Sequence, residues 1–507
     1  MADYCDGDAK ILAKLAVQSR RVATFQTIMP SLAEHYDGDA KQYLETLLRS
    51  QPATDAPTED RLKLQTERAQ AAIILSRIDG TEDSLDALAF DDDPEAATQF
   101  IHRARDRNVP SATLLQSLDF VVQQQDRWAS KRLHDNLYAL LLTLGEYRVE
   151  DIPESKRESI IRQASQWYGD HPSAAVHSVC GWLLRQWGQE AAVEKVDQTP
   201  VPYSADREWY TLAIETTPKA PDAPSEASEA MEAQTESEVE IGDADNVDGI
   251  ERHDTKTTIY LTFCVIPAGE YRIGTEDDPT GVEAAHLVRI TRPYAVLDRE
   301  ITWQQYRAWN PELVHKIVLQ QPQIQIQAPA SYLNWSTAVE YCQWLSEQAG
   351  LDKQLAYSQT DGLYSIHVDK AGFRLPTEAE WEIAARASSR QRFAFGNDVT
   401  VLPKYAWCNR NSADKLIRTP VAALRPNRFG LFDAYGGMLE WCHDGYQPFS
   451  KEIATDPIGA DTSELRMTRG GAWSLDPELA DRRIPLEPEP VRSRNDVGFR
   501  IVQTILE

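Results

Sequence analysis

The sequence has no long apolar run and far fewer basic than acidic residues. No stretch approaches the ~20 apolar residues of a membrane-spanning helix, and the start, Met-Ala-Asp-Tyr-Cys-Asp, lacks the basic and apolar parts of a signal peptide. Lys and Arg number 52 against 79 Asp and Glu, which gives a net charge of -27 at pH 7. This excess disfavours binding to nucleic acid phosphates or anionic lipids. We therefore expect a cytoplasmic protein whose partners are neither nucleic acid nor membrane.

Cysteine is also scarce, since six cysteines stand singly in 507 residues and form no CxxC pair. This usage is typical of reduced thiols and excludes a small disulfide scaffold. The chain is long enough for about three domains at roughly 150 residues each. Its 42% of hydrophobic residues can supply their cores.

The first ~200 residues carry helical periodicity. Apolar residues recur at spacings of three and four in the stretches Ser117–Val122 and Asn136–Leu144, and Gly145 then suits a helix C-cap. A polar break with proline, such as Gly169–Pro172, separates one helix from the next. Residues 1–200 are therefore predicted to be an all-α region of stacked helix pairs, with roughly 40 residues per unit as in HEAT-like repeats.

The composition changes in residues 215–256. From Thr217 to Gly249 acidic residues dominate and Lys219 is the single basic residue. Low hydrophobicity with high net charge cannot offset chain entropy, which predicts an acidic disordered linker or insertion. It serves either as a solvated spacer or as an exposed protease target or docking strip. The candidate cleavage sites are Asp243, Asp245 and Asp248.

Strand patterns begin beyond the acidic stretch. Residues 257–266 read as a strand, the following Pro-Ala-Gly as a turn and residues 270–274 as a second strand, which together predict a hairpin. Residues 257–507 are thus predicted to form a second, α+β domain.

Two helices are clear within this domain. Residues 336–350 are expected to form one, with Ser336 as its N-cap. Residues 377–386 form the other, with Thr377 and Glu380 in a capping box behind a proline. The remainder reads as short strands and long loops rich in Trp, Asn and Gly.

These residues fall into motifs that resemble the formylglycine-generating enzyme family, also called the sulfatase-modifying factor family. The motifs are Ile266–Gly274, Glu300–Tyr306, Asn334–Ala338 with Tyr341–Ser346, Arg374–Glu382, Pro426–Asp433, Arg469–Trp473 and Gly498–Arg500. The resemblance implies a C-type-lectin-like fold for residues 257–507. It also implies that a first strand of the same domain lies at 206–214. The helical half, through Tyr147–Gly188, is similar to the HEAT-like region that precedes this domain in kinase-linked bacterial relatives.

The resemblance also bears on chemistry. Aerobic oxidases of the family bind copper(I) through two cysteines after the Gly-Gly-aromatic strand, and soft thiolates suit that ion. The corresponding positions here are Leu475 and Ala480, which cannot ligate a metal. We therefore expect no copper cofactor and lean towards a pseudoenzyme, a non-catalytic module in bacterial signalling or defence that binds a protein or peptide partner.

Calcium is a second feature that the resemblance implies. The family forms one site around a Gly-Asn-aliphatic-Trp-Glu-Trp loop, and oxygen ligands suit a hard cation. Here the loop is Gly436–Trp441, in which Gly437 replaces the asparagine while Glu440 remains. Glu440 is thus either a ligand of a weakened calcium site or a cap on a backbone turn.

The loop after the Gly-Gly-Trp motif would border the substrate cleft of the family. Such a cleft can bind a ligand by charge and by an aromatic face even without its metal. Solvent-exposed loop residues without a ligand are the alternative. The candidate cleft residues are Trp441, His443, Trp473, Asp476, Glu478, Asp481 and Arg482.

Two functions of other classes stay open. One is a non-haem metal-dependent oxidoreductase with an unrecognised site. Its iron-dependent relatives take histidines from a helical bundle, but the nearest pair here, His171 and His177, does not have the i, i+4 spacing of one helical face. The other is a regulated substrate of a caspase-like or CHAT protease that cuts the acidic insertion.

Overall fold

The computed structural model describes residues 8–53, 56–80, 83–88, 90, 93–127, 129–219, 256–275, 283–360, 363–412, 419–449, 452–460, 464–488 and 494–506. The chain divides into two compact units. The helical unit comprises residues 1–193 and 389–398, and the α/β unit comprises residues 194–388 and 399–507. The predicted acidic segment, with Asp243, Asp245 and Asp248, lies outside the described residues apart from its two ends.

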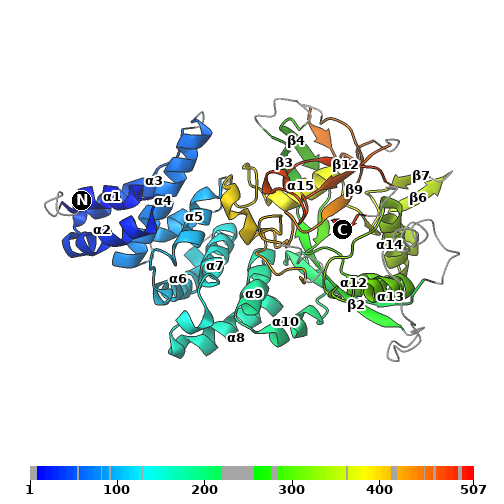
Figure 1. The fold of residues 1–507 in the computed structure, drawn as a ribbon, viewed down its shortest axis with the longest axis horizontal. Coiled ribbons are helices and arrows are strands. Elements are labelled where there is room, and N and C mark those ends of the chain that lie inside the picture. The colour runs from blue at the N-terminus through cyan, green and yellow to red at the C-terminus, as the bar shows by residue number, and fades with distance from the viewer. Residues whose placement is uncertain are drawn as a thin grey trace. The chain divides into compact units, whose positions relative to one another are not determined.

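The N-terminal region is all-helical, as the sequence predicts (Figure 1). Its α-helices are α1 (Ala9–Gln18), α2 (Val22–His35), α3 (Gly38–Arg49), α4 (Thr58–Ile78), α5 (Glu95–Arg103), α6 (Ser111–Gln123), α7 (Ser130–Leu144), α8 (Glu154–Asp170), α9 (Ala174–Gln186) and α10 (Glu190–Asp197). Helices next to each other in sequence pack together, as in α1 with α2, α6 with α7 and α8 with α9. Among the described residues no helix is long and apolar enough to span a membrane.

Gly145 lies at the end of α7 and packs closely against another helix. It is the C-cap of α7, as predicted, but its φ of -70° is open to any residue. Its real constraint is space, because a Cβ there would lie 2.2 Å from the Trp182 ring of α9. The glycine therefore allows α7 and α9 to approach closely rather than supplying a left-handed turn.

Residues 389–398 belong to the helical unit although they lie far along the chain. The buried carboxylate of Glu95 accepts hydrogen bonds from the Asn397 backbone N–H at 3.0 Å and from Gln99 Nε2 at 2.6 Å. Gly396 has a φ of +120°, and a Cβ there would lie 2.2 Å from Glu95 Oε2. Burial raises the pKa of Glu95 to about 7. A buried carboxyl group thus anchors this segment.

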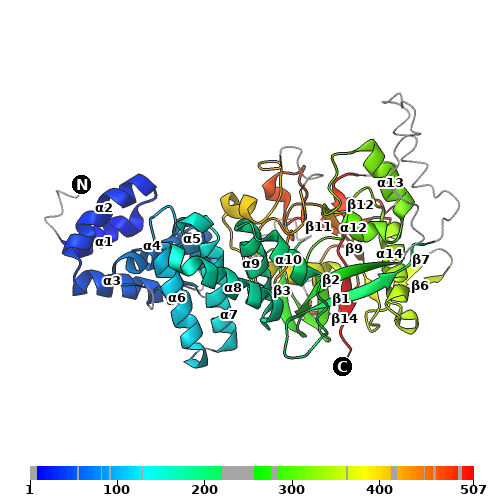
Figure 2. The same ribbon diagram turned by 90° about the horizontal axis from the view of Figure 1, so that it is seen from below.

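The described residues of the α/β unit form four small sheets. The strand orders are β1-β2-β5-β14-β8, β10-β4-β3, β12-β11-β9-β13 and β6-β7. The strands are β1 (Trp209–Thr216), β2 (Thr257–Ile266), β3 (Gly269–Ile273), β4 (His286–Ile290), β5 (Tyr294–Leu297), β6 (Tyr357–Thr360), β7 (Leu363–Ile366), β8 (Phe373–Arg374), β9 (Leu439–Gly445), β10 (Ala454–Thr455), β11 (Arg466–Arg469), β12 (Ile484–Leu486), β13 (Val497–Gly498) and β14 (Val502–Thr504). Strands from both ends of the unit belong to the first sheet, in which β5 lies between β2 and β14. Figure 2 shows β1, β2 and β14 close together.

The predicted hairpin of 257–266 with 270–274 is wrong, although both strands exist. Strand β2 pairs with β1 and β5, whereas β3 pairs with β4 in another sheet. The connection through Pro267 and Ala268 carries the chain from one sheet to the next. The ends of β1 and β2 are in register at Thr216 and Thr257, so the acidic segment joins two adjacent antiparallel strands.

Short helices complete this unit. They are α12 (Trp303–Arg307), α13 (Pro311–Gln320), α14 (Trp335–Gln348) and α15 (Glu378–Arg386). The capping box of Thr377 and Glu380 on α15 is confirmed. The predicted cap Ser336 is wrong, because α14 begins earlier and its N-cap is Asn334, whose side chain accepts a hydrogen bond from the Thr337 N–H. A side-chain amide oxygen performs this task as well as a hydroxyl group.

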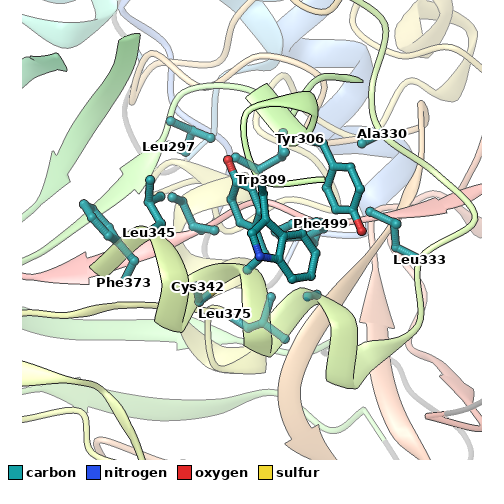
Figure 3. Packing of buried hydrophobic residues seen from close by; sticks show 14 of the residues in the cluster. Leu297, Tyr306, Trp309, Ala330, Leu333, Cys342, Leu345, Phe373, Leu375 and Phe499 are labelled. Atoms are coloured by element: carbon teal, nitrogen blue, oxygen red, sulfur yellow. The ribbon is translucent and has the colours of Figure 1, made fainter. Parts of the chain in front are cut away.

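Aromatic side chains dominate the core of the α/β unit. Trp309 lies between Tyr306, Leu345 and Phe499 (Figure 3). Its ring centroid is 5.2 Å from that of Tyr306 in an edge-to-face contact and 5.8 Å from that of Tyr341. Large rings supply much buried apolar area per residue, which a fold with short strands needs.

Candidate functional site

The candidate site is built on the loop that follows β11. Gly470 and Gly471 both have positive φ, at 95° and 70°, so the chain turns sharply after the strand. A Cβ at Gly471 would lie 2.8 Å from the Cα of Ala480, which packs the two ends of the loop together. Between them Asp476 caps a short 3-10 helix, Pro477–Leu479, by accepting the Glu478 N–H. The loop therefore has a fixed backbone path.

The two positions compared with copper-binding cysteines lie on this loop. Leu475 is partly buried and packs against the aromatic core, and Ala480 is buried beneath Gly471. A leucine and an alanine offer no atom that binds a metal, so the residues present do not fit copper. The loop keeps the two-glycine turn that the resemblance implies, but it lacks the two thiolates.

This loop carries one partly exposed aromatic side chain and several polar ones. Trp473 is partly exposed, and its backbone N–H donates to the Gly437 carbonyl at 2.8 Å. Asp476, Glu478 and Arg482 are exposed, whereas Asp481 is partly buried. The loop thus presents Trp473 beside a polar, mainly acidic surface, which we call the Trp473 rim (residues 473, 476, 478, 481 and 482).

Trp441 and His443, the other candidate cleft residues, lie in the core instead. Both belong to β9, every residue of which is buried. Trp441 donates from Nε1 to the Leu333 carbonyl at 2.9 Å. The His443 ring lies 5.8 Å from that of Trp335 and 5.7 Å from that of Tyr357, and burial lowers its pKa to about 3. His443 is therefore neutral at physiological pH and packs as an aromatic residue.

Glu440 also has a structural setting. Its two carboxylate oxygens each accept a hydrogen bond from Arg500 at 2.6 Å, and Trp381 Nε1 donates to one of them at 2.7 Å. Both partners of this ion pair are almost fully buried. Glu440 could ligate calcium only by leaving Arg500, so the site does not fit the ion in this conformation. Glu440, the glutamate kept from the family motif, therefore links β9 to the segment around Arg500 between β13 and β14.

Two more carboxyl groups lie near this ion pair. Burial raises the pKa of Glu300 well above its usual value, and the charges of Asp433 and Glu440 add to the effect. Burial raises the pKa of Asp433 to about 6. Glu300 accepts the Met438 N–H at 2.8 Å, and a Cβ at Gly437 would lie 2.9 Å from Glu300 Oε1. Glu300 therefore contacts the turn where the family has its asparagine.

The residues that sequence reasoning missed are buried arginines. The carboxylates of α15 each bind one from elsewhere in the unit: Glu378 binds Arg483 at 2.5 Å, Glu380 binds Arg374 at 2.6 Å, and Glu382 binds Arg469 at 2.8 Å. Arg483 thereby ties the far end of the loop to α15, while its guanidinium lies over the Phe449 ring at 4.1 Å. Charged residues inside otherwise apolar motifs were the available signal, since buried charge requires a partner.

Histidines of the helical region do not gather around one point. The rings of His134 and His171 lie 5.4 Å apart, and His102 Nδ1 lies 3.0 Å from a Glu146 oxygen. His177 is buried. Within the part of the chain that the structure describes, no group of three or more His, Cys, Asp or Glu residues is arranged to hold a metal ion.

Comparisons with known proteins place this geometry in a family. A formylglycine-generating enzyme of Streptomyces coelicolor is 28% identical over 275 residues, which are 46% of this chain and 87% of that protein. A formylglycine-generating enzyme of Thermomonospora curvata is 31% identical over 191 residues, 34% of this chain and 54% of that protein. A serine/threonine-protein kinase pkn1 of Chlamydia pneumoniae is 36% identical over 148 residues, 28% of this chain and 22% of that kinase.

Among solved structures, Treponema denticola variable protein 1 aligns with a TM-score of 0.42 and 24% identity, covering 48% of this chain and 95% of that one. The family model described as "Sulfatase-modifying factor enzyme 1-like domain" matches residues 251–505. Because this match takes in half of the chain and contains the loop, the buried arginines and the core described above, the chain belongs to the sulfatase-modifying factor family.

Proposed function

We propose that this chain is a non-catalytic member of its family that binds a protein or peptide partner at the Trp473 rim. The observation that carries the proposal is the pair Leu475 and Ala480, which stand where the resemblance implies copper-binding cysteines. A site without thiolates cannot hold copper(I) or activate oxygen through it. The chain keeps the fold of its family but lacks the copper-binding cysteines. A role in binding rather than in chemistry accounts for both of these features.

The geometry of the rim supports a binding role. Trp473 offers an aromatic face, and Leu479 adds an apolar side chain that is 39% exposed. Asp476 and Arg410 approach to 3.9 Å beside them, which gives polar groups at the edge of the apolar surface. Arg483 holds the end of the loop against Glu378. A rigid loop loses little entropy on binding, which favours affinity.

We further propose that the chain acts in bacterial signalling or defence in the cytoplasm, and that the helical region adds a second protein-binding surface. Stacked helix pairs commonly present such surfaces. Similarity to a bacterial serine/threonine kinase supports a signalling context. The oxidoreductase and protease-substrate alternatives stay predictions. The second concerns Asp243, Asp245 and Asp248, outside the described residues, and is tested by incubation with the cognate protease.

Selection from a random peptide library displayed on phage tests the binding role. The full chain is the target, and enriched peptides are then measured for affinity in solution. We expect Trp473→Ala to weaken binding at least about tenfold, because an aromatic anchor often dominates an interface. The matched control is Leu363→Ser, which removes an apolar residue that is 59% exposed on the β6–β7 hairpin.

The outcomes separate clearly. Loss of binding in Trp473→Ala with full binding in the control supports the proposal. No enriched peptide, or peptides that bind the Trp473→Ala variant as well as the unmodified chain, contradicts it. Circular dichroism of each variant confirms that the fold is intact, since neither side chain is fully buried.

A further inference from the structure

The segment of residues 389–398, which we call the strap, is a compact part of the helical unit. The chain leaves the α/β unit at residue 388 and returns to it at residue 399. Within the strap, Phe393 and Gly396 exchange backbone hydrogen bonds at 3.0 and 3.1 Å, which closes a tight turn. The rings of Phe393 and Phe395 stack with centroids 5.0 Å apart, and both are almost fully buried. The strap is therefore docked rather than exposed.

The carboxyl group of Glu95, the first residue of α5, is in direct contact with the strap. One oxygen accepts the Asn397 N–H at 3.0 Å. The other accepts from Gln99 Nε2 at 2.6 Å, and the same nitrogen donates to Asp398 of the strap at 3.1 Å. Gly396 also approaches this carboxyl group so closely that a Cβ would lie 2.2 Å from it. A change at Glu95 therefore acts on the strap.

The charges around Glu95 come from several elements. Asp93, which precedes α5, and Asp398 of the strap both disfavour a second negative charge there. Arg103 of α5 interacts favourably with Glu95 and Asp398. Arg61 of α4 and Glu95 line one small pocket that is partly open to solvent, which brings water close to Glu95. Burial is the largest influence and raises the pKa of Glu95 to about 7, although its hydrogen bonds oppose this shift.

The chain enters the strap through an unfavourable backbone conformation. Ala387 and Ser388 both have positive φ, at 49° and 67°, a region that residues other than glycine rarely adopt. Such a conformation persists only where the surrounding structure holds it. The contacts of the docked strap, those with Glu95 among them, therefore oppose a backbone that would relax on release.

We propose that residues 389–398 form a proton-controlled strap, which is docked on the helical unit while the Glu95 carboxyl group is protonated and is released when that group ionises. An ionised carboxylate enclosed beside Asp93 and Asp398 costs more than a neutral one, and water solvates it once the strap lifts. Release also exposes the rings of Phe393 and Phe395. The inference is independent of the proposed function, because the strap contains no residue of the Trp473 rim.

Trypsin tests the release, because Arg390 and Arg392 place two cleavage sites within the strap. The full chain and its Glu95→Gln variant are digested between pH 6 and pH 8.5, and mass spectrometry quantifies cleavage at these two bonds. The ratio of the two rates cancels the pH dependence of trypsin itself. Cleavage needs the open strap, whose population rises between the ordinary pKa of Glu95, 4.5, and its docked value of about 7. The ratio should therefore rise about tenfold over this pH range and level off above the docked pKa.

The matched control is Glu158→Gln, which neutralises an exposed glutamate of α8 that pairs with Arg162 at 2.6 Å. It should follow the unmodified chain at every pH. Asp398→Asn keeps Glu95 but removes a charge that disfavours its ionisation, so it should move the rise in cleavage to lower pH. Circular dichroism checks the fold of each variant, and if Glu95→Gln fails to fold, Asp398→Asn against the unmodified chain is the test.

Four outcomes would overturn the proposal. They are a cleavage ratio that does not change with pH, strap bonds that stay uncut at every pH, a Glu158→Gln variant that behaves like Glu95→Gln, and an Asp398→Asn variant whose cleavage rises at the same pH as that of the unmodified chain.

Discussion

Replacing Glu440 by glutamine tests whether the retained motif glutamate serves the fold. The change removes the charge that faces Arg500 but keeps nearly the same shape. Arg500 is 1% exposed, and its remaining partners are the carbonyls of Leu297 at 3.3 Å and Phe432 at 3.1 Å. Breaking a buried ion pair from one side costs about 3–5 kcal/mol, because the other charge stays buried without the carboxylate that binds it directly. The nearby carboxyl groups of Glu300 and Asp433 place the expected cost at the lower end of this range.

Urea unfolding of the full chain, followed by tryptophan fluorescence, measures this cost. We expect Glu440→Gln to lower the free energy of unfolding of the α/β unit by about 3–5 kcal/mol. The double variant Glu440→Leu with Arg500→Met should lose less, because two apolar side chains can replace a buried pair at little cost. Chelation of calcium in the unmodified chain should leave the unfolding midpoint in place.

Three results would refute this reasoning. They are a cost below about 1 kcal/mol for the single variant, a double variant that is as unstable as the single one, and a chelator effect as large as that of Glu440→Gln. The third result would return Glu440 to the role of calcium ligand. It would also mean that the pairing with Arg500 describes the metal-free state alone.

Three further predictions concern other parts of the chain. Asn334→Ala should destabilise the α/β unit by about 1 kcal/mol and Ser336→Ala by only a few tenths, as urea titration would show, because the cap is Asn334; equal effects would contradict this. Gly145→Ala should cost about 1–3 kcal/mol and perturb near-ultraviolet circular dichroism, since its Cβ would meet Trp182, and an unchanged stability would refute the steric explanation. Burial raises the pKa of Glu95 from an ordinary value of 4.5 to about 7, so the fold favours the protonated side chain. The free energy of unfolding should therefore fall as pH rises from about 4.5 to about 7. Hydrogen exchange of residues 389–398 should show this loss, and Glu95→Gln should abolish it.

Much of the fold could be predicted from local signals. The periodicity of α6 and α7 and the capping box of α15 are short-range features, and each reports an element directly. The family motifs likewise predicted an α+β unit, which the structure confirms. These signals depend on residues a few positions apart, so they can be recognised without knowledge of tertiary contacts.

Features that depend on distant residues could not be obtained in this way. The sequence places β2 and β3 next to each other, but β2 pairs with β1, from which the acidic segment separates it, and with β5, whereas β3 pairs with β4. The role of Gly145 likewise depends on Trp182. Sequence patterns describe neighbours along the chain, whereas sheet order and close packing are set by neighbours in space.

The candidate site divides in the same way. Leu475 and Ala480 could be assessed from the sequence alone, because the residue type already shows that no thiolate is present. Trp441 and His443 could not, since their burial on β9 follows from strands on both of its sides. The pairing of Glu378 with Arg483 spans a long stretch of chain, and only the structure brings the two together.

The central claim, that this family member is not a metal-dependent oxidase, is tested most directly by its transition-metal content. The full chain is loaded separately with copper(I) and iron(II), passed through gel filtration and measured by mass spectrometry, with metal expressed per chain. The account predicts far less than one metal ion per chain in both cases. Retention of about one copper or iron ion per chain would contradict it and make the oxidoreductase the leading function.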